Sequence, residues 1–386
     1  MSISQQALRV IIADDSAIYR LVLKKAISAL PGIEIVGLAG DGLEALKQVA
    51  PKRADLILLD LEMPRLSGLQ TLEEIRRRRI PVGVIIVSGT DMRSGTRTMS
   101  ALRGGAFDFI VKPLTTRGQD PTALLRESLA NAIRAFGASL GRSPVRELTS
   151  PAQATGTPAS ILASMQTPPP TPRRDGGLLP SRPEGPPTPS GFRAVVLAIS
   201  TGGPRALAEL LPAIPVDFPV PIYVTQHMPV GFTEHLAHSL DRDCPLSVSE
   251  GAEGQQVGPG QIVIAPGGYH MELQRLKNTV GLRLTTGPPE NSCRPAADVM
   301  FRSASQVYGK DLLALVMTGM GHDGLEGTKV IRAAGGYCIA QHASTCDVNG
   351  MPGSVVDAGQ TDEVVPLNRL AQRLQLLIAT PRMKAA

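Results

Sequence analysis

Acidic and basic side chains follow three short apolar runs in the first third of the chain. Asp14 and Asp15 come after VIIA, Asp60 closes LILLD, and Lys112 follows FIV. Carboxylate oxygens suit Mg²⁺, and a carboxylate can attack phosphorus while a lysine neutralises charge on the phosphoryl oxygens. Ser88, which ends VGVIIVS, is placed to follow an acyl phosphate. The set predicts a phosphoacceptor site with Asp60 as nucleophile and Asp14, Asp15 and Asp60 as Mg²⁺ ligands, although a single acid of this kind is usually a solvated loop residue.

A second group of reactive side chains lies in the latter half of the chain. Ser200 in AISTGGPRAL, His227 in VTQHMPVGFT and Asp323 in MTGMGHDG each follow an apolar run. A serine hydroxyl can act as a nucleophile when an imidazole takes its proton and an acid orients that imidazole. The backbone N–H of Met320, in a glycine-flanked turn, is a candidate to stabilise an oxyanion. The set predicts a hydrolytic triad.

Each triad residue has a simpler interpretation. The turn after Ser200, with Gly202 and Gly203, could cradle a nucleotide phosphate instead, although neither G-x-G-x-x-G nor a P-loop lysine is present. His227 could be structural, and Asp323 could cap the helix that follows it. The chain order Ser, His, Asp and the absence of G-x-S-x-G disfavour an ordinary α/β-hydrolase.

The elements that must position the first group span residues 8–136. Five apolar runs alternate there with amphipathic helical patterns: LRVIIAD, IEIVGLA, DLILLD, VGVIIVS and FDFIVKP. Such alternation predicts a doubly wound parallel sheet, in which ligands gather at the carboxyl ends of the strands. Residues 1–136 are therefore expected to form one flavodoxin-like α/β domain, with its reactive residues along one sheet edge.

A segment rich in proline, serine, threonine and glycine separates the two groups. Residues 137–192 include TPPPTPRRDGG and RPEGPPTPSG and lack hydrophobic periodicity. So little apolar surface cannot offset the entropy cost of ordering a chain, so we expect a disordered, partly polyproline linker.

The α/β alternation resumes at residue 193 and continues to residue 386. Six strand-like runs are visible: AVVLAI, PIYVTQ, QIVIAP, LLALVMTG, YCIAQ and EVVPL. HMELQ and LRLTT are expected to form a hairpin inserted in the sheet. The pattern predicts a second doubly wound parallel-sheet domain, larger than the first.

Composition bounds the kind of protein. A chain of 386 residues with 42% hydrophobic residues can build two cores. Residues 193–386 hold 15 basic and 17 acidic residues, and no aromatic residues accompany the arginine cluster at 76–79, so nucleic-acid binding is not expected. Four cysteines without C-x-x-C spacing indicate reduced thiols. No signal peptide or spanning segment is recognisable, so we expect a cytoplasmic protein without membrane insertion.

The first group of residues resembles the receiver domains of two-component response regulators. The resemblance implies that Asp14 and Asp15 bind metal, that Asp60 is phosphorylated and that Lys112 is the family's invariant lysine. It also implies that Ser88 is the switch hydroxyl and that Phe109 is an aromatic rotamer switch. A histidine kinase would be the phosphodonor.

The second group resembles the catalytic domain of the chemotaxis protein-glutamate methylesterases, through AISTGGPRAL, QHMPVGFT, RPAADVMFRSAS and TGMGHDG. The resemblance implies that Ser200 is the nucleophile, His227 the base, Asp323 the orienting acid and Met320 an oxyanion donor. The substrate would be methylated glutamate on chemoreceptors, with methanol released and no cofactor needed. Glutamine deamidation would accompany this activity.

The chain departs from that family at several places. The linker is long, and the family usually has an acid pair where this chain has His342 and Ala343, and an arginine where it has Gly353. We expect the unphosphorylated receiver to obstruct the catalytic domain and phosphorylation to relieve this. Two alternatives are a regulator whose second domain only docks a partner, and a DNA-binding output module, which six strand-like runs disfavour.

Overall fold

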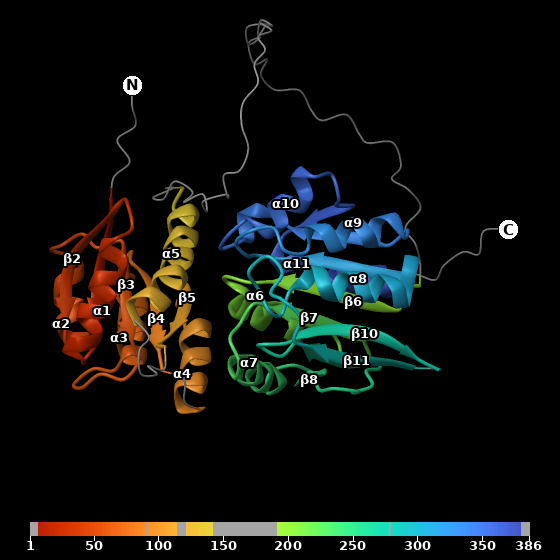
Figure 1. Cartoon of the computed structure of the whole chain (residues 1–386), viewed down its shortest axis with the longest axis horizontal. Helices are drawn as coiled ribbons and strands as arrows, with labels where there is room; N and C mark the ends of the chain where they lie inside the picture. Colours follow the sequence, from red (N-terminus) through yellow and green to blue (C-terminus); the bar gives the residue numbers. More distant parts are fainter. Residues whose placement is uncertain (1–6, 90–91, 114–120, 142–190, 278, 380–386) are drawn as a thin grey trace, which may run out of the picture. The chain divides into compact units, whose positions relative to one another are not determined.

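The computed structural model describes residues 7–89, 92–113, 121–141, 191–277 and 279–379 (Figure 1). These residues form two α/β domains. We name them after the families that their sequences resemble: the receiver domain, within residues 7–141, and the catalytic-fold domain, within residues 191–379. Within these described ranges, every helix is too short or too polar to span a bilayer.

The receiver domain is built on a parallel five-stranded sheet with the strand order β2-β1-β3-β4-β5. Its strands are β1 (Leu8–Ala13), β2 (Ile33–Ala39), β3 (Leu56–Asp60), β4 (Gly83–Ser88) and β5 (Asp108–Val111). Its helices are α1 (Ala17–Ser28), α2 (Gly42–Val49), α3 (Gly68–Arg77), α4 (Met92–Arg103) and α5 (Pro121–Ser139). The five predicted strands and the parallel topology are confirmed.

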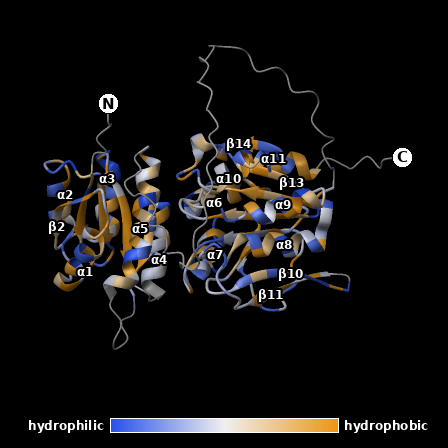
Figure 2. Ribbon diagram, turned by 45° about the horizontal axis from the view of Figure 1, so that its top comes forward, coloured by the Kyte–Doolittle hydropathy of each residue, from blue (hydrophilic) through white to orange (hydrophobic). Residues whose placement is uncertain are grey.

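Both faces of the receiver sheet are buried, which explains the continuous apolar runs. Val10 and Ile12 of β1 belong to the core that includes residues of α1 and α5, whereas Ile11 packs in the core with α2, α3 and α4. Figure 2 shows the hydrophobic residues concentrated along the strands. This burial fixes the strand register and so places the end of each strand at a common edge.

Helix α5 runs past residue 136, where the sequence predicts the end of the first domain. Helix α5 continues to Ser139, three residues into the segment predicted to be a linker. Phe136, with 6% of its surface exposed, packs in the receiver core and anchors this last turn. The prediction of disorder for most of the linker falls on residues 142–190, which lie outside the described residues.

The catalytic-fold domain has a seven-stranded parallel sheet with the order β14-β13-β12-β6-β7-β9-β8. Its strands are β6 (Ala194–Ile199), β7 (Ile222–Gln226), β8 (Ser247–Glu250), β9 (Gln261–Ile264), β12 (Leu312–Val316), β13 (Tyr337–Gln341) and β14 (Glu363–Val365). Its α-helices are α6 (Gly203–Leu210), α7 (Phe232–Asp241), α8 (Ala297–Tyr308), α9 (Leu325–Ala333), α10 (Met351–Asp357) and α11 (Leu367–Ala379). The six predicted strands are confirmed.

Two features of this domain differ from the prediction. The strands β10 (His270–Leu276) and β11 (Thr279–Thr285) do form an antiparallel hairpin, but the hairpin is a sheet of its own. Its apolar residues Met271, Leu273 and Leu282 pack with those of α8. The edge strand β8, with the sequence SVSE, was not predicted because it is short and polar. An edge strand has one neighbour and needs less apolar surface than a central one.

The central strand β6 lies between β7 and β12, where the order of strands along the chain reverses. Helices α8, α9 and α10 lie on one face of the sheet and α6, α7 and α11 on the other (Figure 1). Ligands of open parallel sheets bind beyond the carboxyl ends of the strands at such a reversal. The residues that follow β6, β7 and β12 are therefore the ones to inspect.

Candidate active site

The receiver domain brings its predicted acids together at the carboxyl edge of its sheet. Asp14 and Asp60 are buried, Asp15 is exposed, and one oxygen from each lies within 4.8 Å of the others. Lys112 Nζ lies 2.8 Å from Asp14 Oδ2 and 3.1 Å from Asp60 Oδ1. The phosphoacceptor set predicted from sequence is thus a real cluster.

The electrostatics of this cluster favour a further cation. Burial raises the pKa of Asp60 to about 6, against the opposing effect of Lys112. Burial lowers the pKa of Lys112, but its contacts with Asp60 and Asp14 outweigh burial and raise it. Asp14 Oδ2 is buried, and among the described residues its cationic neighbour is Lys112, with Nζ at 2.8 Å, which leaves a further lone pair of the oxygen open. A buried carboxylate oxygen with a free lone pair, beside two other carboxylates, fits an oxygen-preferring divalent cation.

The two predicted switch residues lie on neighbouring strands. Ser88, at the end of β4, is 1% exposed, and its Oγ accepts a hydrogen bond of 2.7 Å from Thr98 Oγ1 on α4. Phe109 is half-buried on β5, paired in register with Ile86 of β4. Any movement of the Ser88 hydroxyl toward Asp60 would therefore break its contact with α4.

In the catalytic-fold domain, Ser200 begins the turn between β6 and α6. Its N–H donates to Thr318 O at 3.0 Å, and its carbonyl accepts from Gly203 N at 2.7 Å. Gly202 takes a φ of 80°, the left-handed region in which a side chain is strained. The glycines thus allow the tight turn that presents the Ser200 hydroxyl at the sheet edge.

His227 follows β7 and lies beside Ser200 at the edge of the sheet. The register pairs Ile199 with Gln226, so the next residue of each strand is Ser200 and His227. His227 Nε2 lies 2.6 Å from Asp323 Oδ2, and the imidazole is only 12% exposed. Within the described residues no hydrogen bond joins the Ser200 hydroxyl to the imidazole. Catalytic hydrogen bonds are often long before substrate binds. The Ser200 hydroxyl and the His227 imidazole, at the ends of neighbouring strands, can therefore still pair during the reaction.

The pKa values of the His227 and Asp323 pair move apart. Burial lowers the pKa of His227, but the hydrogen bond with Asp323 and the neighbouring Cys293 outweigh burial, and the pKa lies above the ordinary histidine value. Burial works to raise the pKa of Asp323, but His227 and backbone N–H groups overcome this effect and lower it. The acid is therefore held as a carboxylate that stabilises a protonated imidazole.

Asp323 is not the cap of helix α9. Its Oδ2 accepts from His227 and from Ala297 N at 2.6 Å. The capping role belongs instead to Asp298 on α8, whose Oδ1 accepts from Gly324 N at 3.0 Å and Gly327 N at 2.6 Å. The alternative interpretation of Asp323 as a helix cap is therefore wrong.

The loop carrying Met320 packs against the Ser200 turn. A Cβ added to Gly319 would lie 2.8 Å from Ser200 Cβ, which shows how closely the two backbones approach. The Met320 N–H donates no hydrogen bond within the described part of the chain. A free N–H next to a nucleophile can stabilise an oxyanion.

Sequence reasoning missed three residues that contact the triad. Gln226 Nε2 donates to the carbonyls of Ser200 at 3.0 Å and His227 at 3.2 Å, so it ties the two turns together. Thr318 Oγ1 donates to Thr201 O at 3.0 Å. Cys293 lies close enough to His227 to raise the pKa of the imidazole. Gln226 and Thr318 directly precede recognised motif residues, which is the only signal that could have suggested them.

The segment that departs from the family pattern borders the Met320 loop. Gly319 N donates to Val348 O at 3.0 Å, and Met351 N donates to Gly319 O at 2.9 Å. His342 is exposed and its Nδ1 accepts from Ser344 N at 3.2 Å, which begins a 3₁₀ turn at Ala343. Gly353 lies in α10 beside Asn349. The departures thus lie near the edge of the site rather than at the triad.

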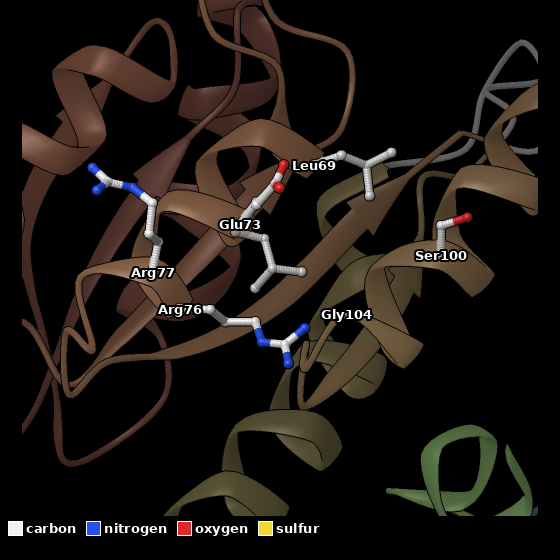
Figure 3. A pocket seen from close by; sticks show the side chains of 7 residues that line it. Leu69, Glu73, Arg76, Arg77, Ser100 and Gly104 are labelled. Atoms are coloured by element: carbon white, nitrogen blue, oxygen red, sulfur yellow. The ribbon is translucent and has the colours of Figure 1, made fainter. Parts of the chain in front are cut away.

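A separate cavity of about 560 Å³ lies between α3 and α4 of the receiver (Figure 3). It is lined by Leu69, Leu72, Glu73, Arg76, Arg77, Ser100 and Gly104. In Figure 3 the Arg76 guanidinium lies beside Gly104, and the Ser100 hydroxyl points away from the Glu73 carboxylate. The serine and the acid of this cavity are therefore not arranged as a nucleophile and its base.

Comparison with known proteins identifies the families of the two domains. Residues 10–118 match the response regulator receiver domain, and residues 195–374 match the CheB methylesterase family. A protein-glutamate methylesterase/protein-glutamine glutaminase of Desulfotalea psychrophila is 38% identical over 95% of this chain and 97% of its own length. The chain belongs to this family.

A second relative and one solved domain are also similar to this chain. A protein of Pseudomonas aeruginosa with the same name, numbered 2, is 38% identical over 95% of this chain and 95% of its own. A crystal structure of the Thermotoga maritima CheB methylesterase catalytic domain is 40% identical, covers 49% of this chain and 100% of that one, and has a TM-score of 0.48.

Proposed function

We propose that this family member is a serine esterase that removes methyl groups from glutamate methyl esters on chemoreceptors. The observation that carries the proposal is the 2.6 Å hydrogen bond between His227 Nε2 and Asp323 Oδ2, next to the turn that presents Ser200. The relatives' names, protein-glutamate methylesterase/protein-glutamine glutaminase, agree with this chemistry. The substrate would be a methyl-accepting chemoreceptor, reached from the cytoplasm.

The reaction follows from the roles that the geometry allows. Ser200 Oγ attacks the ester carbonyl and transfers its proton to His227 Nδ1, the ring nitrogen that Asp323 leaves free. The Met320 N–H stabilises the oxyanion of the tetrahedral intermediate. The intermediate expels methoxide, which takes the proton from His227 and leaves as methanol. Water then hydrolyses the acyl-enzyme by the same proton transfers, which restores the glutamate carboxylate and Ser200.

Glutamine deamidation would use the same groups. The amide carbonyl is attacked in the same way, and ammonia leaves in place of methanol after accepting the proton from His227. The amide is the poorer substrate because its leaving group is more basic, so this activity depends more on proton donation by His227.

We propose that phosphorylation of Asp60 by a histidine kinase activates the esterase. Asp14, Asp15 and Asp60 would hold a Mg²⁺ ion, which when bound neutralises charge on the phosphoryl oxygens. Asp60 accepts the phosphoryl group, and Lys112 supports the developing charge. Ser88 would then exchange its hydrogen bond with Thr98 for one with the acyl phosphate, which frees α4 and alters the switch face of the receiver. Phe109 would change rotamer with it.

The direct test of the proposed function is methanol release from membranes carrying methylated receptors. The full chain is assayed with and without a small phosphodonor and Mg²⁺. We expect release without the donor and faster release with both additions. Absence of methanol under both conditions would refute the esterase, whereas equal rates would refute only the regulation.

Asp60→Asn should abolish the response to phosphodonor. The amide cannot form an acyl phosphate, so the stimulation of roughly 5- to 150-fold that a typical allosteric coupling provides should fall to none. Rates are measured with and without phosphodonor and Mg²⁺. Asp217→Asn, which makes the same chemical change at an exposed site, is the control and should keep full stimulation. Stimulation that survives in Asp60→Asn would place the phosphoacceptor elsewhere.

Cys293→Ala should move the rising limb of the pH–rate profile to lower pH. Asp323 and, second to it, Cys293 raise the pKa of His227, and the base works only when neutral. Removing the thiol lowers the pKa of His227, so the neutral imidazole forms at lower pH and the rate begins to rise at lower pH. The plateau rate should change little. Cys346→Ala, which alters another half-buried thiol, should leave the limb in place. A limb unmoved by Cys293→Ala would mean that another group controls it.

A further inference from the structure

Apart from Cys293, the short turn at residues 290–293 next to the triad has no role in the reaction described above. Glu290 and Cys293 exchange backbone hydrogen bonds of 3.1 Å and 2.9 Å, which closes the turn at residues 290–293. Arg302 on α8 donates to both carboxylate oxygens of Glu290, at 2.7 Å and 2.5 Å. The 290–293 turn is therefore anchored to α8 and can hold its side chains in defined places.

Asn291 in this turn contacts two buried carboxylates at once. Its Nδ2 lies 3.0 Å from Asp323 Oδ1 and 2.9 Å from Asp298 Oδ2. An amide nitrogen has two N–H groups, and both are used here. Because both neighbours are carboxylate oxygens, the nitrogen and not the oxygen of the amide must face them.

Asp298 is held independently of Asn291. Its other oxygen accepts from Gly324 N and Gly327 N, and the residue is 1% exposed. It is thus a fixed acceptor, and Asn291 is held between it and Asp323. Without the amide, backbone N–H groups such as that of Gly324 would be the remaining donors between two buried carboxylates, and no side-chain donor of the described residues would join Asp323 Oδ1 to Asp298 Oδ2. Asp323 is the carboxylate that must keep its orientation toward His227.

We propose that Asn291 is a positioning residue of the esterase, which holds Asp323 against His227 by bridging it to Asp298. Asparagine also suits the backbone, because residue 291 has a φ of 52°, a left-handed value that asparagine and aspartate tolerate better than most residues. The inference rests on the proposed function, since it assigns Asn291 a part in that reaction. It adds a residue outside the triad whose effect should be on turnover and not on receptor binding.

The test is Asn291→Asp in the full chain, with methanol release from methylated receptor membranes as the readout. Aspartate keeps the size and the backbone tolerance but replaces two donors with an acceptor. We expect kcat to fall roughly 10- to 100-fold with an unchanged KM, because Asp323 loses its alignment while the receptor surface is untouched. Asn368→Asp, an exposed position on α11, makes the same change in charge and should leave both constants unchanged.

A double variant separates positioning from folding. Asn291→Asp with Asp298→Asn restores a donor and an acceptor between positions 291 and 298 but gives Asp323 no amide donor from position 291. We expect the Tm lost in Asn291→Asp to return while kcat stays low. A kcat that recovers together with the Tm would overturn the proposal, and so would an unchanged kcat in Asn291→Asp. If the unchanged protein and Asn368→Asp release no methanol, the proposed function fails and this inference with it.

Discussion

Ser200→Ala should reduce methanol release by about 10⁴-fold or more. The Ser200 hydroxyl is the proposed nucleophile, and triads that lose their nucleophile retain only what binding and the oxyanion donors supply. The fold should survive, because the backbone contacts of Ser200 with Thr318 and Gly203 do not involve the side chain. Methanol release measures the loss of activity. Receptor binding and Tm are measured in parallel to show that the variant still binds its partner and is still folded.

The same variant separates an enzyme from a docking module. If the second domain only binds a partner, Ser200→Ala and the unchanged protein would behave alike in both assays. The proposed function requires lost hydrolysis with intact receptor binding. Ser249→Ala on the edge strand β8 is the matched control and should retain full activity, because β8 is separated from β7 by β9.

The sequence allows the strand ends to be predicted well because parallel strands are buried on both faces. The runs LILL, before Asp60, and LLALV are apolar throughout, so their carboxyl ends mark the sheet edge where Asp60 and, beyond a loop, Asp323 lie. Local pattern also identifies the Ser200 turn, since two glycines before a helix permit only a tight turn. These features depend on residues close together in the chain.

Contacts between distant segments could not be predicted in the same way. Asp298 caps α9 from another helix, 26 residues before Gly324, so no local capping signal exists. Asn291 and Cys293 reach the triad only because the 290–293 turn is anchored to α8. The β10–β11 hairpin is separate from the main sheet because its apolar residues pack against α8. An alternating hydrophobic pattern predicts a strand but does not predict which element will pack against it.

The environment of Asp323 explains why its acid cannot be replaced by an amide. Its two oxygens receive five hydrogen bonds. The donors are His227 Nε2 and Ala297 N to Oδ2, and Asn291 Nδ2, Asp298 N and Gly324 N to Oδ1. An amide has a single acceptor oxygen, so whichever way it turns its NH₂ group faces N–H donors.

Asp323→Asn should therefore lower kcat by roughly 10³- to 10⁴-fold, because the imidazole loses both its orientation and the charge that stabilises its protonated form. The carboxylate also raises the pKa of His227. Its removal lowers that pKa, so the neutral base forms at lower pH and the rising limb of the residual pH–rate profile should move downward. Methanol release measured across pH checks both effects.

A buried acid elsewhere in the domain shows whether lost stability alone could explain the result. Asp362 pairs with Arg332 and accepts from Cys338 N at 2.8 Å, so Asp362→Asn also disturbs a buried ion pair. Asp362→Asn should lower Tm while leaving kcat and the rising limb of the pH–rate profile unchanged, because Asp362 contacts no triad residue within the described part of the chain. If Asp362→Asn loses activity as severely as Asp323→Asn, the loss reflects folding, and Asp323 would have no special role in orienting His227.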